Sequence, residues 1–521
     1  MRPEPSVRLL SGGLDPVDTA VAAARTCYSG KGPVAPEAVA GLAARGEDHR
    51  RRREALARSL YEAGHHTTFQ HVHFVFVIEG VSRQFVWSFL HAHPFANSEQ
   101  VSQRYVPVAA DAVHVPALPP AAESAFLRAV EKRHRSYRGL VELLTPVARD
   151  EMLRRFPGWS RHPGRLERAA TKKALEVARS VLPVATLTAL YHTVSCLTLF
   201  RYRRLCRQFD VPAETEAVVE AMVGAVLREA PGLAAVLQEP LPLEATPEYR
   251  IFTELHSSAP QRAAFREEFD AALAGRTSRL VGRGADNVAC VAAAVRAVFG
   301  LPGVAMSDEE AVRAALDPAA NTLLGEDLNL TTLSKLGRCL DHAHYTFAKK
   351  LSHAADSQDQ RHRMTPAARP LLNAVAVDGP DLVVPRLVAA AGGRAESLFQ
   401  EAAAGAWDEA AAVVEAGGGW EPAAYLLPNA MALRFVESAD LLHLHHKHRM
   451  RLCYNAQEEI WQASLDEARE ISLVEPAIGR WLAPPCAVRH AAGRRPYCPE
   501  GDRFCGVPVW RLQRDEYHRI V

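Results

Sequence analysis

The sequence has few cysteines, almost no net charge and only one long apolar run, and each shortage excludes a class of protein. Nine cysteines in 521 residues, an odd number, are too few for a secreted disulfide framework. Lysine and arginine number 61 against 60 acidic residues, so a net charge of +1 gives no overall field that attracts nucleic acid or an anionic membrane. Residues 1–5 lead into no apolar segment of signal-peptide type. We therefore expect a cytoplasmic protein with no nucleic-acid or membrane partner.

The one apolar run, residues 181–200, is long enough to raise the question of a membrane span. It contains Pro183, His192 and several hydroxyl residues, and it stands alone, so we expect a buried helix there. The apolar fraction of 48% and the charged fraction of 23% are ordinary for globular proteins. The length corresponds to about three domains.

Most of the remaining sequence is typical of helices. Alanine-rich amphipathic segments predict helices at residues 37–62, 124–150, 166–208, 215–229, 263–274, 394–415 and 433–468. The clearest strand is residues 71–78, where aromatic and β-branched residues alternate with a period of two. A proline cluster at residues 240–247 is the best candidate for a linker.

Two internal echoes suggest that the chain contains the same unit twice. The segment HVHFVF at residues 71–76 is echoed by HAHYTF at residues 342–347, an offset of 271 residues (342 − 71). Arg204-Leu205-Cys206 is echoed by Arg451-Leu452-Cys453, an offset of 247 residues (451 − 204). Because the echoes keep their order, they predict a tandem duplication with insertions and deletions; chance similarity between alanine-rich helices is the alternative.

Three segments carry groups suited to an anionic ligand. The triplet Arg361-His362-Arg363 concentrates hydrogen-bond donors that suit phosphate or pyrophosphate, although such a triplet also occurs on solvated surfaces. The polar loop at residues 97–105 could hold a nucleotide phosphate through Ser102 and Arg104, or be an ordinary turn. A helix at residues 443–460 places Arg451 and Asn455 on one face, or is a charged surface helix.

Together these segments resemble the flavin-dependent thymidylate synthases. That family has an Arg-His-Arg triplet, then a Ser near an Arg-Tyr pair, and a late helix that begins Arg-Leu and continues Ala-Gln-x-Glu-Ile. Here the triplet is at residues 361–363, Ser102-Gln103-Arg104-Tyr105 matches the nucleotide loop, and residues 451–460 match the helix. Early landmarks at residues 24–28 and 64–71 also fit. The matched segments cover about a third of the chain, and residues 244–330 carry no family feature.

The two copies have lost different parts of the family pattern. In the first copy the triplet position reads His91-Ala92-His93, and the loop from His93 to Ser102 is one residue longer than in the family. In the second copy Leu371 stands where Ser is expected, and Ala424 where the first copy has Arg179. The first copy thus keeps the nucleotide loop and Arg179, and the second keeps the triplet and the Arg451 helix. We interpret this as one composite site built from both copies; decay of both is the rival interpretation.

The resemblance implies an α+β fold: two tandem copies of a helix-rich domain with an antiparallel sheet, followed by a Cys/His-containing C-terminal tail. The expected domains are residues 1–243, the nucleotide-loop repeat, residues 244–484, the Arg-His-Arg repeat, and residues 485–521, the tail. The family builds its sites where the subunits of a homotetramer meet, so a double-length chain is expected to form a homodimer of four repeats.

The implied reaction is the methylation of dUMP to dTMP with methylenetetrahydrofolate and NADPH, with FAD as cofactor. Arg104, Arg179 and Arg451 would be catalytic, because cationic groups near the uracil carbonyl stabilise the charge that develops during the reaction. The dUMP-binding residues would be Gln100, Ser102, Gln103, Arg104, Arg179, Gln358 and Arg451. The FAD-binding residues would be Arg361, His362, Arg363, His65, Thr67 and His446.

The tail contains Cys486, His490, Cys498 and Cys505 in the spacing C-x3-H-x7-C-x6-C. Four such ligands suit a tetrahedral structural zinc site, and three unconnected thiols are the alternative. Two other functions stay open. One is a catalytically decayed flavin- or nucleotide-binding pseudoenzyme, and the other is a zinc-containing nucleic-acid-binding protein that uses the basic residues 489–495.

Overall fold

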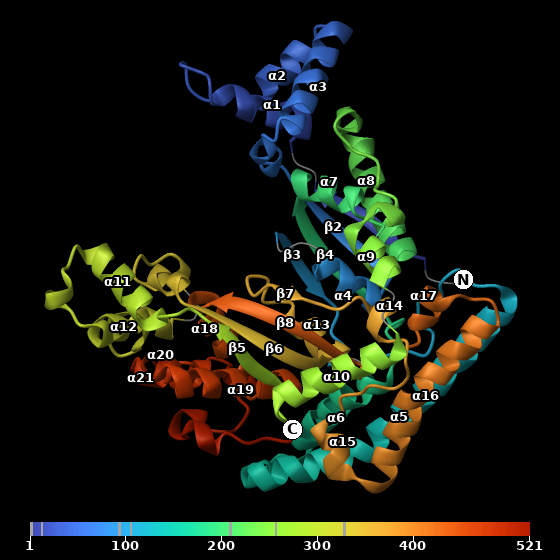
Figure 1. Cartoon of the computed structure of the whole chain (residues 1–521), viewed down its shortest axis with the longest axis vertical. Helices are drawn as coiled ribbons and strands as arrows, with labels where there is room; N and C mark the ends of the chain where they lie inside the picture. The colour runs from blue at the N-terminus through green and yellow to red at the C-terminus, as the bar shows by residue number, and fades with distance from the viewer. Residues whose placement is uncertain are drawn as a thin grey trace.

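The computed structural model describes residues 4–11, 14–91, 95–104, 107–207, 211–255, 258–326 and 330–521. Within them lie two separate four-stranded antiparallel sheets among long helices (Figure 1). The first sheet has the order β1 (Ser6–Ser11), β2 (His73–Ser82), β4 (Leu187–Ser195), β3 (Ala96–Gln100). The second has the order β5 (Ser278–Arg283), β6 (His344–Ser352), β8 (Ala432–Asp440), β7 (Ala367–Ala368). The same strand order in both sheets confirms the prediction of two tandem α+β copies.

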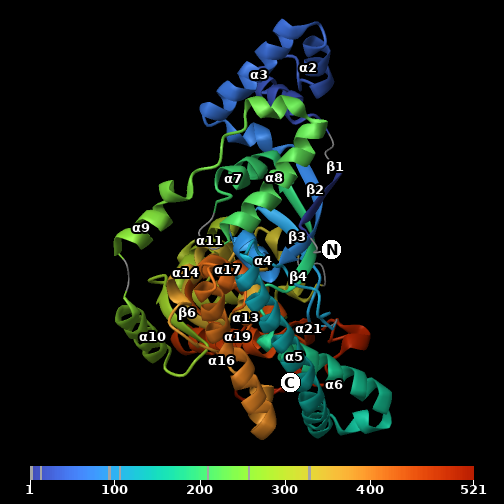
Figure 2. The ribbon, with the colours of Figure 1, turned by 90° about the vertical axis from the view of Figure 1, so that its right-hand side faces the viewer.

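The helices that matter for the site occupy equivalent places in the two copies. Each second strand is followed by a short helix, α4 (Arg83–His91) or α13 (His353–Asp359). Strand β4 of the first copy is followed by α7 (Cys196–Arg204) and then α8 (Pro212–Glu229). Strand β8 of the second copy is followed by α18 (Leu441–Arg451) and then α19 (Glu458–Val474). The long helices α5 (Pro120–Arg155) and α16 (Gly393–Glu415) lie side by side (Figures 1 and 2).

The other helices complete the chain order. They are α1 (Pro16–Thr26), α2 (Pro36–Ala43), α3 (Glu47–Glu62), α6 (Pro163–Ala178), α9 (Pro247–Leu255), α10 (Ala259–Leu273), α11 (Asn287–Phe299), α12 (Asp308–Leu316), α14 (Leu372–Val375), α15 (Arg386–Ala391), α17 (Trp420–Ala424), α20 (Pro476–Gly479) and α21 (Pro485–Ala491). Two short 3-10 helices also bear on the site: η1 (His66–Gln70) and η3 (Arg179–Val181).

The two copies meet around Pro183 and Pro428, which pair as an antiparallel bridge. Matching hydrogen bonds run in both directions across it: Val184 N to Leu427 O and Asn429 N to Leu182 O, both 2.9 Å, and Ala185 N to Tyr425 O, 2.9 Å, and Ala430 N to Ser180 O, 2.8 Å. Such reciprocal contacts are the signature of an isologous, two-fold dimer interface. Here the interface lies within one chain.

The same contacts fix which residues of the two copies correspond. Ser82 Oγ donates to Glu214 at 2.7 Å and Ser352 Oγ to Glu459 at 2.7 Å, so the offsets are 270 residues for the serines (352 − 82) and 245 for the glutamates (459 − 214). Gly80, with φ of +70°, lies where the pairing of β2 shifts register, and before this bulge the offset is 271. The helix starts of α7 and α18 also differ by 245 (441 − 196), so Cys206 corresponds to Arg451. The Arg-Leu-Cys echo in the sequence is therefore two residues out of register.

Two of the predicted helices and the predicted buried apolar helix are wrong. Residues 166–208 contain α6, η3, β4 and α7, and residues 433–468 contain β8, α18 and part of α19. The apolar run at residues 181–200 is mostly strand β4 and the start of α7. Alternate side chains of β4 (Thr188, Leu190, His192) are buried on one face of the sheet, which is the pattern of a strand and not of a helix. In the described parts of the chain no helix is long and apolar enough to cross a membrane.

The C-terminal tail packs on the second copy. Cys486, Val509 and Tyr517 belong to the same buried cluster as Trp461 of α19. Residues 278–283 of the segment without family features form β5, the edge strand of the second sheet. The domain boundaries after residues 243 and 484 stay predictions.

Candidate active site

The nucleotide loop of the first copy reaches the second copy. Arg104 Nη2 donates to the backbone oxygen of Asn455 at 2.8 Å, and Arg104 Nε pairs with Glu176 of α6. Ser102 Oγ accepts from the backbone N–H of Arg104 at 3.2 Å, which holds the turn. The side chain of Gln103 is buried, and its Nε2 has no hydrogen-bond partner among the described residues. The loop therefore presents Arg104 and an unsatisfied donor at the junction of the two copies.

Arg179 and Gln358, from different copies, meet at one amide group. Arg179 Nη2 donates to Gln457 Oε1 at 3.4 Å, and Gln358 Nε2 donates to the same oxygen. Arg179 Nε also donates to the backbone oxygen of Glu176 at 3.1 Å, and only 6% of Arg179 is exposed. The start of α19, which carries the family-like Ala-Gln-x-Glu-Ile sequence, thus joins the two copies.

The Arg-His-Arg triplet of the second copy faces β3 of the first. Arg361 pairs with Glu99, and Arg363 Nη2 donates to Asn97 Oδ1 at 3.0 Å. Asn97 and Glu99 are two residues apart, so they lie on one face of the strand. His362 lies between this edge and α18.

Arg451 ties α18 to the triplet. Its Nε donates to His362 Nε2 at 2.8 Å, and its Nη2 donates to the backbone oxygen of Gln358 at 2.8 Å. The ring of His446 lies 5.9 Å from that of His362. Burial, helped by the charges of Arg451 and Lys447, keeps the pKa of His362 well below its usual range, so the neutral ring can accept from Arg451.

The electrostatics of this cluster favour an anionic ligand. Burial, together with the charges of Arg361 and Arg104, lowers the pKa of Arg451 to about 10. Burial alone would raise the pKa of Glu176, but the charges of Lys173, Arg104 and Arg179 outweigh it and lower the pKa to about 2. Several guanidiniums thus share few carboxylates in a partly desolvated place, which is the environment that phosphate prefers.

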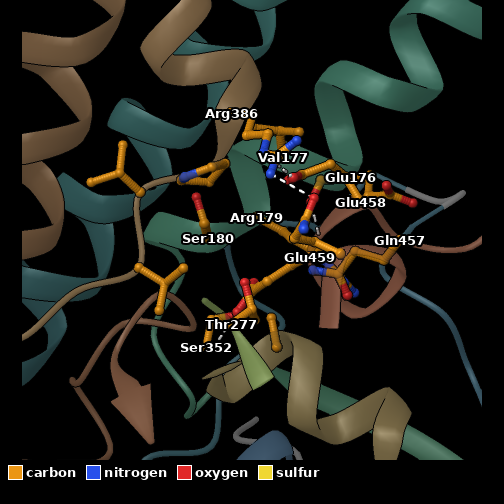
Figure 3. Close-up of a pocket in the computed structure, with 15 residues that line it drawn as sticks. Glu176, Val177, Arg179, Ser180, Thr277, Ser352, Arg386, Gln457, Glu458 and Glu459 are labelled. Atoms are coloured by element: carbon orange, nitrogen blue, oxygen red, sulfur yellow. Dashed lines mark hydrogen bonds and ion pairs between the residues drawn. The ribbon is translucent and has the colours of Figure 1, made fainter. Parts of the chain in front are cut away.

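A cavity of about 140 Å³ lies behind Arg179 (Figure 3). It is lined by Arg179 and Ser180 of the first copy and by Arg386, Gln457 and Glu459 of the second. Ser180 Oγ is buried and has no hydrogen-bond partner among the described residues, and burial raises the pKa of Glu459 to about 7. The cavity can therefore accept a polar group next to the arginine cluster.

The corresponding place on the other side of the pseudo-two-fold axis is closed. Tyr425 stands where the first copy has Ser180, and its hydroxyl donates to Glu214, the equivalent of Glu459, at 2.7 Å. Ala424 replaces Arg179 there. Among the described residues, Tyr425 thus fills the place that corresponds to Ser180 and the cavity beside Arg179.

The mirror triplet position is also occupied by protein side chains. Trp87 Nε1 donates to Asp356 at 2.7 Å, and Arg369 pairs with the same carboxylate at 2.8 Å. His91, at the place of Arg361, lies 3.6 Å from Asp356. Ala92, His93 and Tyr105 lie outside the described residues. In the described part of the mirror site, the carboxylate of Asp356 is therefore already bound by the side chains of Trp87 and Arg369.

One residue of the cluster was missed by sequence reasoning. Arg83, the first residue of α4, donates from Nη1 to Gln100 Oε1 at 3.1 Å and from Nη2 to the backbone oxygen of Val101 at 2.6 Å. Burial, with the charge of Arg179 nearby, lowers the pKa of Arg83 to about 9. Arg83 directly follows β2, which runs to Ser82, but it lies five residues beyond the predicted strand at residues 71–78 (83 − 78), so the predicted strand gave no signal for it.

His65 and Thr67 are not part of this cluster. Both are exposed on and beside η1, which packs against α1 and α7. In Figure 1, α1 lies near the top of the view, α7 lies between α1 and the first sheet, and α13 lies beside the second sheet. Within one chain, the structure brings together the predicted dUMP residues, the triplet and His446, but not these two.

The structure does not bring three of the predicted zinc-ligand atoms within 4.8 Å of one another. Among the described residues a single group does so, and it is Asp341, Asp440 and His443. His490 packs edge-on against Tyr497, with ring centroids 4.7 Å apart, and Cys505 Sγ contacts the backbone oxygen of Val507. Burial, together with the nearby thiols of Cys453, Cys505 and Cys498, raises the pKa of Cys486 to about 12. The zinc site stays a prediction.

A family profile described as thymidylate synthase complementing protein matches residues 8–232 and 279–477, most of both copies. The chain belongs to this family. The predicted membership of the flavin-dependent thymidylate synthase family is thereby confirmed, and the two matched segments agree with a double-length form.

Members of this family with curated names match about half of the chain or less. The flavin-dependent thymidylate synthase of Nitratidesulfovibrio vulgaris is 32% identical over 246 residues, 45% of this chain and 87% of the relative. That of Geobacter sulfurreducens is 31% identical over 181 residues, 34% of this chain and 75% of the relative. The solved structure of a UMP/dUMP methylase, PolB from Streptomyces cacaoi, is 20% identical with a TM-score of 0.31, covering 45% of this chain and 97% of that one.

Proposed function

We propose that the chain is a flavin-dependent thymidylate synthase that methylates dUMP to dTMP at one composite site per chain. Methylenetetrahydrofolate would supply the carbon and NADPH the two electrons, leaving tetrahydrofolate and NADP⁺. The observation that carries this proposal is the convergence of Arg104 and Arg179 from the first copy with Gln358 and Arg451 from the second. The names of the relatives support the reaction class.

The arginine cluster fits a nucleotide monophosphate. Arg104 and Arg179 would bind the phosphate and orient the base, since each already spans the junction of the copies. Arg451 would lie near the uracil carbonyl, where a fixed cation stabilises developing negative charge without reorganisation. Gln103, with its buried unsatisfied Nε2, offers a further donor.

The triplet fits the pyrophosphate of FAD. Arg361 and Arg363 are exposed and contact polar side chains of β3, and the carboxylate of Glu99 is 80% exposed, so an anion can replace it beside Arg361 at little cost. Bound FAD supplies the hydride chemistry that side chains cannot perform. The protein itself would hold and orient the flavin through four residues: Arg361, His362, Arg363 and His446.

A homodimer would complete the flavin site. His65 and Thr67 are exposed and remote from the triplet of their own chain, so a second copy of the chain is the natural source of these groups for each triplet. All nine cysteines are free thiols, which supports the proposal that the protein functions in the reducing cytoplasm. Sedimentation that finds only monomers, with and without FAD, would remove the dimer from this proposal.

A pseudoenzyme is the second candidate, and the occupation of the mirror site by Trp87 and Tyr425 supports it, since the loss of one site is a step towards the loss of both. Expression in a thymidine auxotroph separates the two. We expect growth without thymidine, and dTMP formation by the purified protein that depends on added dUMP, FAD, methylenetetrahydrofolate and NADPH. A yellow protein that supports neither would be the pseudoenzyme.

A further inference from the structure

A network of buried charges lies directly beneath the Arg-His-Arg triplet. It consists of Lys349 on β6, Asp359 at the end of α13, Glu437 on β8, Lys447 and His448 on α18, and Glu467 on α19, all with side chains at most 2% exposed. Lys447 Nζ lies 3.1 Å from Asp359 Oδ1, Lys349 Nζ 3.1 Å from Glu467 and 3.3 Å from Glu437, and His448 Nε2 3.0 Å from Glu467. We call this set the buried ion network.

The fold does not need these charges. At the positions equivalent to Lys349, Asp359, Glu437, Lys447 and Glu467 the first copy has Ile78, Phe89, His192, Tyr202 and Met222, all buried. The equivalent of His448 is Arg203 (448 − 245), which is part-buried and pairs with Glu220 at 3.0 Å, outside this group of five. Phe89, His192 and Tyr202 pack as an aromatic triad, with ring centroids 4.6 to 5.8 Å apart. Since burying ions costs desolvation energy that apolar side chains avoid, the same architecture closes more simply without them. The network exists only in the copy that kept its triplet.

The network is connected to the triplet through one turn of chain. Asp359 ends α13, and its backbone oxygen accepts from the N–H of His362 at 3.0 Å. Lys447 and Arg451 are four residues apart on α18, so they lie on the same face. Lys447 binds the carboxylate of Asp359, and Arg451 binds His362 and the backbone oxygen of Gln358. Two adjacent cationic side chains therefore hold this turn against α18.

The charge state of Asp359 agrees with such a clamp. Burial alone would raise the pKa of Asp359, but the ammonium groups of Lys349 and Lys447 outweigh it and hold the pKa well below its usual range. The ionised carboxylate is thus the favoured form of Asp359 beside these two lysines. In the first copy the equivalent pair is Tyr202 and Phe89, and Cys206 replaces Arg451, so neither charged contact exists.

We propose that the buried ion network positions the Arg-His-Arg triplet, with the Lys447–Asp359 pair fixing the turn from which Arg361 and His362 reach their ligand. These are positioning residues, because none of them touches the site surface. That the ligand is FAD rests on the proposed function; the fixing of the turn does not. Where the first copy has aromatic packing, the second copy has ion pairs and hydrogen bonds, whose fixed directions hold the turn in one conformation.

The test transplants the aromatic triad of the first copy into the second. The triple variant Asp359→Phe, Glu437→His, Lys447→Tyr leaves Lys349 paired with Glu467 and uses side chains that already pack in this architecture. We expect hydrogen exchange of residues 361–363 to rise about tenfold, while β6 and β8 stay protected. We expect FAD to bind about tenfold more weakly, through loss of preorganisation. Lys447→Arg as a single change, with Asp359 and Glu437 left in place, keeps the charged pair and should leave both the exchange of residues 361–363 and FAD affinity close to those of the unaltered protein.

Each outcome has a distinct meaning. Wild-type exchange at residues 361–363 in the folded triple variant would overturn the proposal, since packing alone would then fix the turn. If the triple variant does not fold, Asp359→Asn, which removes the charge at constant shape, is measured in its place and must show the same rise in exchange. If the unaltered protein binds no FAD, the proposed function fails, and the exchange measurement still decides whether the network positions the turn.

Discussion

Arg361→Ala should yield a folded protein that purifies colourless. Arg361 is 42% exposed and its partner Glu99 is more exposed still, so its removal breaks no buried contact and should change the melting temperature little. A guanidinium that binds pyrophosphate through paired, charge-assisted hydrogen bonds contributes about 3 kcal/mol, so FAD affinity should fall about a hundredfold. Visible absorbance of the purified protein and titration with FAD measure this.

His91→Ala is the matched control, because His91 is the equivalent of Arg361 in the first copy (361 − 91 = 270). His91 lies by Asp356 in the closed mirror site, so its removal should leave the protein yellow and its FAD affinity unchanged. Equal loss of flavin in both variants would mean that the triplet has no special part. Full retention in Arg361→Ala would assign the flavin to another place.

Arg451→Ala should lower kcat/KM for dUMP by about a thousandfold, the effect typical of removing a preorganised charged donor from a reacting carbonyl. The variant should also be less stable than the parent, because it loses the hydrogen bonds of Arg451 to His362 Nε2 and to the backbone oxygen of Gln358. Burial and the charges of Arg361 and Arg104 lower the pKa of Arg451, and relief of this unfavourable burial offsets part of that loss.

Cys206→Ala gives the matched comparison for Arg451, because Cys206 holds the equivalent place 245 residues earlier. The Cys206 side chain is buried in the core of the first copy, and the Ala variant should keep kcat/KM within about twofold. Steady-state kinetics at saturating FAD, together with a melting curve, check both variants. A fall of less than tenfold in Arg451→Ala would contradict the role of Arg451 near the base.

The sequence allowed some elements to be predicted and concealed others for physical reasons. The strand at residues 71–78 was predicted because one of its faces is more exposed, which gives a clear alternation. Strands β4 and β8 were missed because they are central and flanked by helix-forming segments, so they look like parts of long apolar helices. The duplication could be predicted from the repeated segments, and the α+β fold of each copy from the resemblance to the family.

The site residues could be predicted in part, because each motif is a short local sequence. Their assembly could not, because it depends on contacts between residues far apart in the chain. Arg104 and Asn455 are 351 residues apart and meet only through the pseudo-two-fold contact at Pro183 and Pro428. The zinc site stays a prediction, because spacing says nothing of where a side chain points: Cys486 lies in the same buried cluster as Trp461. The buried ion network has no motif, since its members come from five separate elements.

The number of FAD molecules bound per chain tests the central claim most directly. A composite site assembled from Arg104, Arg179, Arg361 and Arg451, opposite a mirror site closed by Trp87 and Tyr425, predicts a ratio of one. Titration of the purified full-length protein, with protein concentration from amino-acid analysis, gives this ratio. One FAD per chain, lost in Arg361→Ala and kept in His91→Ala, is the predicted result; two per chain, or none, would contradict the account.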